Sequence, residues 1–372
     1  MSSPHNHLSK TNKLDIAIIG GGSAGITLAA KLTNFSGVVV EPKTPLQRDC
    51  SWALWANGAQ KKQFQAAVKG SWQQWRVRDH STEVLHQSDQ FHYISLSSAK
   101  YMTQCESDLV EGVDLIRATA EDIQIEGEGG SFNAAGQRYR ADKIYDSRPP
   151  KMPPNSLKQH FLGWEIRTRN PISDPQIATL MDFRVDQSRG LHFIYVLPFS
   201  DRHLLIESTM ISKDLQEKVW YQQAIQQWLK DQNIEIEEIL GEETGIIPMN
   251  SLDPLEIKPR AIGAASGAVR LSSGYAFANI QVQINTLAEG INNGDFSVPK
   301  PISSFLNKMD KIFNAVLMAQ PELGVTIMVR TAKALDADGF ARFMLGTATL
   351  IDWAKVILAM PKIAFIKQLL PR

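Results

Sequence analysis

Three glycines and one acid near the start of the chain have the spacing of a nucleotide-binding turn. Gly20, Gly22 and Gly25 come directly after an apolar run at residues 14–19, and Glu41 follows about twenty residues after the first glycine. In such a turn the first glycine permits a tight bend, the second lets the backbone approach a pyrophosphate, and the third lets helix and strand pack closely. A carboxylate at the position of Glu41 can accept hydrogen bonds from a ribose. The spacing predicts a dinucleotide site and leaves nicotinamide and flavin cofactors both open.

The residues around the glycines must form a strand, a helix and a second strand to build this site. The run at 14–19 is apolar enough for a buried strand, an amphipathic segment extends from Ser23 to about Leu32, and residues 38–40 are apolar again. A helix that begins beside the glycines turns free N–H groups and a partial positive charge towards the phosphates. We therefore expect Ser23 and Ala24 to contact the cofactor.

Two later stretches are expected to approach the same cofactor. Residues 140–146 read as a strand that ends in Asp146, and ligands of nucleotide-binding sheets sit at the carboxyl ends of strands. Residues 260–275 are rich in small side chains and lead into a long helix. Since such a helix start lets the backbone come close to a ligand, Gly274 and Tyr275 are predicted to contact the cofactor.

Glu207 is the acid whose surroundings suggest chemistry. Residues 161–209 have the alternation of an antiparallel sheet, and Glu207 shares a strand face with Leu205 and Thr209 because side chains alternate with period two. A carboxylate on such an apolar face has either a partner or a raised pKa. The alternative to a catalytic acid is a structural acid paired with Arg167 or Arg184.

Composition excludes several function classes. The 372 residues are enough for two or three domains, and 39 basic residues balance 39 acidic ones, which gives no electrostatic reason to expect nucleic acid. Cys50 and Cys105 have no CxxC or metal-ligand spacing, so we predict neither a disulfide scaffold nor a metal site. The polar start of the chain lacks the apolar core of a signal peptide, and a cytoplasmic location is expected.

The C-terminal end is apolar without a run as long as the ~20 residues of a membrane-spanning helix. Residues 356–366 are the most apolar part, and Lys355, Lys362 and Lys367 punctuate them. Such segments either pack as core helices or lay an apolar face on a membrane surface with the lysines towards headgroups, at its inner face for a cytoplasmic protein.

Four of the eight tryptophans fall close together, at Trp52, Trp55, Trp72 and Trp75. Wide planar side chains can line a pocket for a large apolar ligand, or they can fill a core. The sequence leaves these two interpretations open.

Several segments, taken in order, resemble the bacterial flavin-dependent lycopene cyclases, which close the ends of linear carotenoids into rings. The likeness runs through most of the chain. It is concentrated in FLGWEIRTRNP (161–171), MDFRVDQ (181–187), YVLP (195–198), LLIEST (204–209), GIIP (245–248), SGY (273–275) and the closing segment 341–358.

The resemblance implies a flavoprotein with an α/β fold. We predict an FAD-binding Rossmann-type domain built from residues 13–50, 97–150 and 245–296, and an antiparallel, sheet-rich substrate domain from residues 51–96 and 151–244. Residues 297–372 then form a helical C-terminal region that meets the membrane. The implied substrate is an apolar polyene or isoprenoid-type compound.

The reaction that the resemblance implies is an isomerisation without net electron transfer. An acid protonates a terminal double bond, the resulting carbocation closes the ring, and a proton is lost. FAD is used in its reduced form, with NAD(P)H as a candidate reductant. The family's acidic strand motif matches LLIEST, so Glu207 takes the role of the acid, and Asp182 of MDFRVDQ is the rival acid.

The chain departs from the family pattern at several positions. Ser208 stands where a second acid follows the motif glutamate, and Ser272 and Ser273 stand where the family has two threonines. Two alternatives therefore stay open: a redox flavoenzyme of the monooxygenase or halogenase kind, and a non-catalytic flavoprotein that binds a prenyl or polyene chain. The halogenase pattern Trp-x-Trp-x-Ile-Pro is absent from the sequence.

Overall fold

The glycine turn lies at the end of the central strand of a six-stranded sheet. The structure is a computed structural model that describes residues 12–149, 151–153, 155–250 and 260–369. The strand order is β8-β2-β1-β11-β10-β9, and β1 pairs in parallel with both β2 and β11. The strands are β1 (Asn12–Ile19), β2 (Gly37–Val40), β8 (Val113–Ile116), β9 (Glu121–Glu126), β10 (Gly129–Ala134) and β11 (Gln137–Asp146). This is the parallel strand pair around a glycine turn that the spacing predicts.

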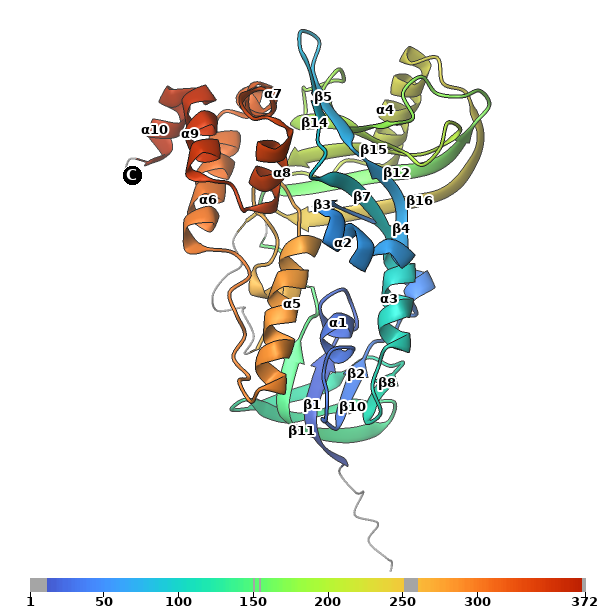
Figure 1. Cartoon of the computed structure of the whole chain (residues 1–372), viewed down its shortest axis with the longest axis vertical. Coiled ribbons are helices and arrows are strands. Elements are labelled where there is room, and N and C mark those ends of the chain that lie inside the picture. Colours follow the sequence, from blue (N-terminus) through green and yellow to red (C-terminus); the bar gives the residue numbers. More distant parts are fainter. Residues whose placement is uncertain (1–11, 150, 154, 251–259, 370–372) are drawn as a thin grey trace, which may run out of the picture.

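Three helices stand between this sheet and the rest of the molecule (Figure 1). They are α1 (Gly25–Ala29), α3 (Ser98–Ser107) and α5 (Phe277–Asn292), and α1 packs against the other two. The predicted helix from Ser23 to Leu32 is shorter than expected. After Ala29 the chain continues in tight turns, with the Lys31 N–H donating to the Leu28 carbonyl, and Asn34 takes a left-handed conformation (φ 62°) before β2.

A seven-stranded sheet forms the second layer, in the order β16-β12-β15-β14-β13-β5-β6. All its pairs are antiparallel except β13 with β5. The strands are β5 (Gln74–Arg78), β6 (Glu83–Gln87), β12 (Lys158–Thr168), β13 (Ile177–Asp182), β14 (Leu191–Pro198), β15 (His203–Ser212) and β16 (Ile236–Pro248). Helix α4 (Lys218–Asp231) covers one face through a cluster that includes Trp164, Ile225 and Trp228.

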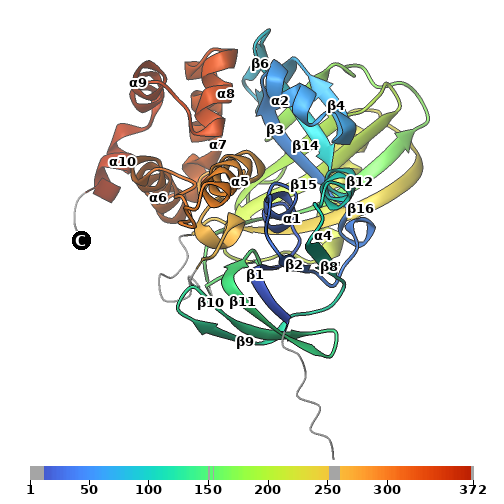
Figure 2. The ribbon, with the colours of Figure 1, turned by 60° about the horizontal axis from the view of Figure 1, so that its bottom comes forward.

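A small three-stranded sheet and α2 (Gly58–Gln63) lie beside the seven-stranded sheet, at the top of Figure 2. Its strands are β3 (Ser51–Ala56), β4 (Val68–Trp72) and β7 (His92–Ser97), with β7 in the middle. The segment at 245–248, which we predicted for the nucleotide-binding domain, instead belongs to β16 and pairs with β12. Residues 251–259, which belong to the predicted nucleotide-binding segment 245–296, lie outside the described residues.

The C-terminal region is helical, as predicted. It consists of α6 (Ser304–Ala319), α7 (Gly324–Ala334), α8 (Ala337–Leu345), α9 (Leu350–Ala359) and α10 (Lys362–Leu369). A buried ion pair joins the loop before α5 to α6, with Arg270 Nε 2.9 Å from an Asp310 carboxylate oxygen. In the ranges that the structure describes, no single helix meets the length and hydropathy of a membrane span, while α6 with the segment Pro321–Ala334 meets them only as a pair bent by 114°.

Candidate active site

A cavity of about 900 Å³ runs from the glycine turn to the C-terminal helices. Ser23 and Ala264 line one end of it, and Ile357, Leu358 and Ile366 line the other. Between them the walls are mostly aromatic and aliphatic side chains from the seven-stranded sheet, the small sheet and the loop before α5. Such a long apolar space with few polar groups suits a large hydrocarbon ligand beside a cofactor.

Two of the three glycines of the turn, Gly20 and Gly25, are required by the protein's own geometry. Gly20 has φ +94°, which favours glycine, and its N–H donates to the Val40 carbonyl at 2.9 Å. A Cβ on Gly25 would lie 1.9 Å from the Gly20 carbonyl oxygen, so helix and strand could not pack this closely. A Cβ on Gly22 would meet nothing within 4 Å, which leaves open the space through which a pyrophosphate would approach. The turn fits a dinucleotide.

Glu41 sits directly behind this turn. Its Oε2 accepts the Gly21 N–H at 2.9 Å and lies 3.3 Å from Arg48 Nη1, and its Oε1 accepts the Lys43 N–H at 3.0 Å. The carboxylate therefore fixes the turn and still has acceptor capacity on Oε1, since each carboxylate oxygen can take two hydrogen bonds. The ribose contact stays a prediction.

Asp146 ends β11 next to Ile19, so it lies beside the glycine turn as expected. Its carboxylate is bound by Arg148, whose Nε lies 3.0 Å and Nη2 2.7 Å from its two oxygens. The neighbouring Ser147 hydroxyl donates to the Gly20 carbonyl at 2.7 Å. Asp146 thus shapes the loop that borders the turn, and a direct cofactor contact of its carboxylate stays a prediction.

Three tyrosine hydroxyls form a row inside the cavity. The Tyr93 hydroxyl lies 2.7 Å from that of Tyr275 and 2.9 Å from that of Tyr195. Burial raises the pKa of all three phenols well above the ordinary value, so they stay neutral. Gly274, in a left-handed conformation (φ +75°), and Tyr275 both line the cavity, and Tyr275 reaches its interior. Their predicted cofactor contacts are untested.

Glu207 faces the cavity from β15, on the strand face that the period-two pattern predicts. It stands opposite Tyr195 on β14 and opposite Gly163 on β12, and is only 8% exposed. Burial is the main cause that raises the pKa of this carboxyl well above its usual range, and the neighbouring Glu243 adds to it. Burial therefore favours the protonated form of Glu207. Neither predicted arginine partner holds it, because Arg167 pairs with Glu238 and Arg184 pairs with Asp182.

Glu243 on β16 is a residue that the sequence reasoning missed. Its register partner on β12 is Gly163, the same residue that faces Glu207 from the other side. An isolated glycine within a strand often marks a close approach of neighbouring groups, and Gly163 was the signal that could have found this acid. Glu243 is hydrogen bonded to the backbone N–H of Ser51 at 2.8 Å.

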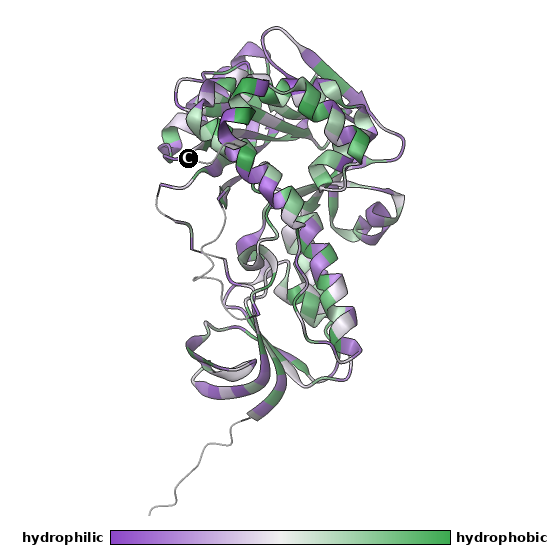
Figure 3. Cartoon of the chain, turned by 90° about the vertical axis from the view of Figure 1, so that its left-hand side faces the viewer, coloured by the Kyte–Doolittle hydropathy of each residue, from purple (hydrophilic) through white to green (hydrophobic). Residues whose placement is uncertain are grey.

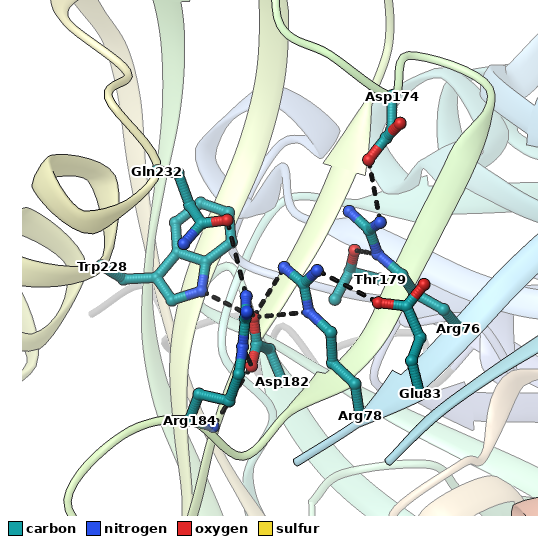
Figure 4. Close-up of polar contacts among 9 residues, drawn as sticks. All are labelled: Arg76, Arg78, Glu83, Asp174, Thr179, Asp182, Arg184, Trp228 and Gln232. Carbon is teal, nitrogen blue, oxygen red and sulfur yellow. Dashed lines mark hydrogen bonds and ion pairs between the residues drawn. The ribbon is translucent and has the colours of Figure 1, made fainter. Parts of the chain in front are cut away.

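Asp182, the predicted rival acid, is a structural anion. Its fully buried carboxylate lies 2.8 Å from Arg78 Nη2 and 2.9 Å from Arg184 Nη2, and Trp228 Nε1 donates to it at 2.9 Å (Figure 4). Although burial alone would raise its pKa, these hydrogen bonds and charges lower the pKa below the usual value. An acid held ionised by two arginines has no proton to give, and Asp182 is not among the residues that line the cavity. The structure therefore gives Asp182 a structural role in place of the predicted role of rival acid.

Of the four clustered tryptophans, two line the cavity and two fill the core. Trp52 and Trp55 line the cavity, whereas Trp72 and Trp75 are buried in the core beneath it. The Trp55 ring lies 4.6 Å from that of Tyr93 and 5.3 Å from that of Tyr275, measured between centroids. The cavity wall beside Glu207 is thus largely aromatic.

Sequence comparison finds one family along almost the whole chain. The family model described as Lycopene cyclase protein matches residues 15–370. Neoxanthin synthase of Solanum tuberosum is 24% identical over 311 residues, which cover 76% of this chain and 61% of that protein. Lycopene beta-cyclase of Pantoea ananas is 26% identical over 226 residues, or 57% of this chain and 58% of that protein. The chain thus spans about three fifths of the length of these curated relatives.

Structure comparison finds the same fold in flavoenzymes. A geranylgeranyl bacteriochlorophyll reductase-like protein from Thermoplasma acidophilum has a TM-score of 0.63 at 14% identity, covering 96% of this chain and 98% of that chain. A flavin-dependent brominase has a TM-score of 0.63 at 13% identity, covering 96% and 100%. The predicted α/β fold with C-terminal helices is confirmed.

Proposed function

Because the chain belongs to the lycopene cyclase family, we propose that it closes an end group of an apolar polyene or terpenoid into a ring without net oxidation or reduction. The observation that carries this proposal is the position of Glu207, an acid whose pKa is raised by burial, on the wall of an apolar cavity. A hydrocarbon offers no polar handle, so its redox-neutral cyclisation needs a local proton donor that is still protonated when the substrate binds.

In the proposed reaction Glu207 both donates the first proton and accepts the last one. Its O–H gives the proton to the terminal alkene, a C–H bond forms, and positive charge develops on the neighbouring carbon. A second double bond attacks that carbon and closes the ring. The new cation then loses a proton from an adjacent carbon to the Glu207 carboxylate, which restores the acid and yields a cyclic alkene of unchanged mass.

The aromatic wall supports such a reaction in two ways. The π faces of Trp55, Tyr93 and Tyr275 can stabilise a passing positive charge, an effect of about 0.5–2 kcal/mol per well-placed ring. The same rings keep water away from the cation, which would otherwise be trapped as an alcohol. Neutral phenols do this without acting as strong bases.

The residues at the glycine turn fit FAD and would hold its pyrophosphate and ribose. Gly22, Ser23 and Ala24 would provide the close backbone approach at the start of α1, with Glu41 behind them. When bound in reduced form, FAD supplies an electron-rich ring that stabilises nearby positive charge. We propose NAD(P)H as its reductant.

Gly22→Ala tests the cofactor site separately from the fold. The added Cβ meets no protein atom, so the free energy of unfolding of the apoprotein should stay within roughly 0.5 kcal/mol of wild type. The same Cβ would stand where the pyrophosphate approaches, and we expect FAD affinity to fall on the order of tenfold or more. Fluorescence titration with FAD and urea unfolding measure the two quantities.

Gly58→Ala is the matched control, because its Cβ also meets nothing within 4 Å and lies in the first turn of α2. It should change neither FAD affinity nor unfolding appreciably. Wild-type FAD affinity in Gly22→Ala would contradict the placement of the cofactor.

An exposed apolar surface on α9 and α10 supports contact with a membrane. Figure 3 shows hydrophobic segments along the C-terminal helices. The exposed side chains are Leu350, Ile351, Ile357, Leu358, Ile363 and Ile366. Three of them, Ile357, Leu358 and Ile366, also line the end of the cavity, so an apolar substrate could pass from lipid into the site. We propose a location at a membrane surface, and the cytoplasmic side stays a prediction.

Replacement of Leu350 and Ile351 by serine should weaken binding to lipid vesicles. These two side chains are 89% and 69% exposed, and loss of their apolar area should lower the partition coefficient roughly tenfold or more. Co-sedimentation with phosphatidylcholine and phosphatidylglycerol vesicles measures it. Val219→Ser on α4, a site 56% exposed and outside the C-terminal helices, is the control. Equal binding of all three proteins would contradict the proposed surface.

The proposed activity is tested with purified, FAD-loaded protein and a linear carotenoid in vesicles. A cyclase yields a product of unchanged mass and consumes no stoichiometric NAD(P)H. A monooxygenase adds an oxygen and consumes NAD(P)H and O₂, and a binding protein leaves the substrate unchanged. Either of the last two results would replace the proposal by one of its alternatives.

A further inference from the structure

Two glutamates on different strands point at each other across a glycine. In the register of the seven-stranded sheet, Gly163 of β12 is paired with Glu207 of β15 on one side and with Glu243 of β16 on the other. All three residues therefore share one face of the sheet. Since neighbouring strands lie about 4.8 Å apart, the two glutamate backbones are separated by roughly 10 Å, a gap that two glutamate side chains can close only by leaning over the middle strand.

Gly163 makes that approach sterically possible. A Cβ at this position would lie 2.7 Å from Cγ of Glu207 and 3.4 Å from Cγ of Glu243. The first distance is shorter than any real Cβ contact, so any other residue would push the Glu207 side chain away from its partner. The glycine is thus required by the pair of acids, because it carries no side chain between them.

The two carboxyl groups have different surroundings. Glu207 lines the cavity and lies among the tyrosines, whereas Glu243 lies behind it, at the edge strand, and is partly exposed. The Glu243 carboxylate accepts the Ser51 N–H, and the charge of Lys69 favours its ionised form. The proximity of the two carboxyls raises the pKa of Glu207 and lowers that of Glu243, although burial keeps the pKa of Glu243 above its ordinary value. The Ser51 N–H and the Lys69 charge therefore favour the proton on Glu207.

We propose that Glu243 is the positioning residue of the acid: its carboxylate accepts the Glu207 O–H across Gly163 and so holds the proton on the carboxyl that faces the cavity. The inference rests on the proposed role of Glu207 as proton donor. When Glu207 gives its proton to the substrate, two adjacent carboxylates remain. Their repulsion makes Glu207 the stronger base that takes the proton back once the ring has closed.

Other titratable groups lie around Glu207 and Glu243 and contribute to the pKa values of the two acids. Tyr93 and Tyr195 come from β7 and β14, and Tyr275 from the loop before α5. Around Glu243 the groups are Lys69 of β4, Glu165 of β12 and Cys50 before β3. Lys69 is held by Glu165 at 2.6 Å, and the Cys50 thiol is neutral because burial and nearby acids raise its pKa to about 11. None of these groups is altered by the changes proposed below.

Glu243→Gln separates this role from a merely structural one. The substitution keeps the size and polarity of the side chain but removes its negative charge and adds an N–H donor, and both changes favour the ionised form of Glu207. We expect the pKa of Glu207 to fall by about one unit or more, a roughly tenfold increase in its acid dissociation constant. Gly163→Ala should move the pKa in the same direction by separating the carboxyls. Gly241→Ala on β16, whose Cβ would meet nothing, is the control.

The measurement is an infrared pH titration of the protein in D₂O without substrate. The protonated carboxyl band that disappears in Glu207→Gln belongs to Glu207 and should titrate above the ordinary range of a glutamate in wild type. The proposal predicts that its midpoint moves to lower pH in Glu243→Gln and in Gly163→Ala. The alkaline limb of the cyclisation pH profile should move with it.

The outcomes separate this inference from the proposed function. A band that titrates identically in wild type, Glu243→Gln and Gly163→Ala would overturn the role of Glu243, whatever the activity. A shifted band in a protein that forms no ring would support the carboxyl pair and remove the proposed cyclisation instead.

Discussion

Glu207→Gln is expected to lower the turnover number by roughly three orders of magnitude, because the amide cannot give a proton to an alkene. The variant should bind FAD with wild-type affinity, since Glu207 lies in the wall of the seven-stranded sheet and not at the glycine turn. Product formation per bound flavin, measured by chromatography and mass spectrometry, checks both statements.

Glu242→Gln is the matched control for this change. Glu242 is the neighbour of Glu243 on β16 and pairs with Lys218 and with Trp164 Nε1, on the opposite face of the sheet. Its substitution should leave turnover within about twofold of wild type, since a surface ion pair contributes little. Full activity of Glu207→Gln would remove Glu207 from the role of proton donor.

The same substitution has a defined effect on stability. Because the pKa of Glu207 is raised in the folded protein, its favourable contribution is complete below the pKa of the unfolded chain and is lost as pH rises through the folded pKa. Gln has no charge to bury, so Glu207→Gln should be about as stable as wild type at acid pH, below the pKa of glutamate in the unfolded chain, and increasingly more stable than wild type as pH rises above it. Loss of activity through unfolding is therefore not expected.

Asp182→Ala should produce the opposite pattern, a large loss of stability of about 3–5 kcal/mol. The substitution leaves Arg78, Arg184 and Trp228 Nε1 without their shared acceptor, and Arg78 is buried (Figure 4). The molecules that remain folded should cyclise substrate at nearly the wild-type rate per bound flavin. Urea unfolding and activity per flavin measure the two quantities.

Glu83→Gln is the control for this cluster, because Glu83 is the half-exposed second partner of Arg78 at 3.3 Å. Removal of this outer charge should cost less than about 1 kcal/mol. If Asp182→Ala were as stable as wild type and inactive, Asp182 and not Glu207 would be the acid. The stabilising contribution of Asp182 should also fade as pH falls through its lowered folded-state pKa.

Local pattern was enough to predict much of the fold. The glycine turn with its flanking strands and Glu41 depends on spacing within thirty residues or so, and the side-chain face of Glu207 depends only on period-two alternation. The hairpin of β14 and β15 follows from the short turn between them. These features are local, so the sequence contains the information directly.

The features that the sequence did not predict depend on contacts between segments that are far apart in the chain. Glu243 lies in an acid-rich run, IEEILGEETGIIP, which alone is typical of an exposed strand. Only the pairing of β16 with β12 brings this residue next to Gly163 and thus to Glu207. The surroundings of Asp182 also depend on long-range contacts, because its partners Arg78 and Trp228 are 104 and 46 residues away in the chain. Its motif position could not show that its charge was already neutralised.

Cyclisation in D₂O tests the central claim most directly. FAD-loaded, reduced protein is equilibrated in D₂O, so that the Glu207 carboxyl carries deuterium, and is then given a linear carotenoid for a single turnover. We predict that each ring formed contains one deuterium and no other change in mass, and that Glu207→Gln forms none. A ring without deuterium, or a product that has gained oxygen, halogen or a pair of hydrogens, would contradict acid-initiated, redox-neutral cyclisation.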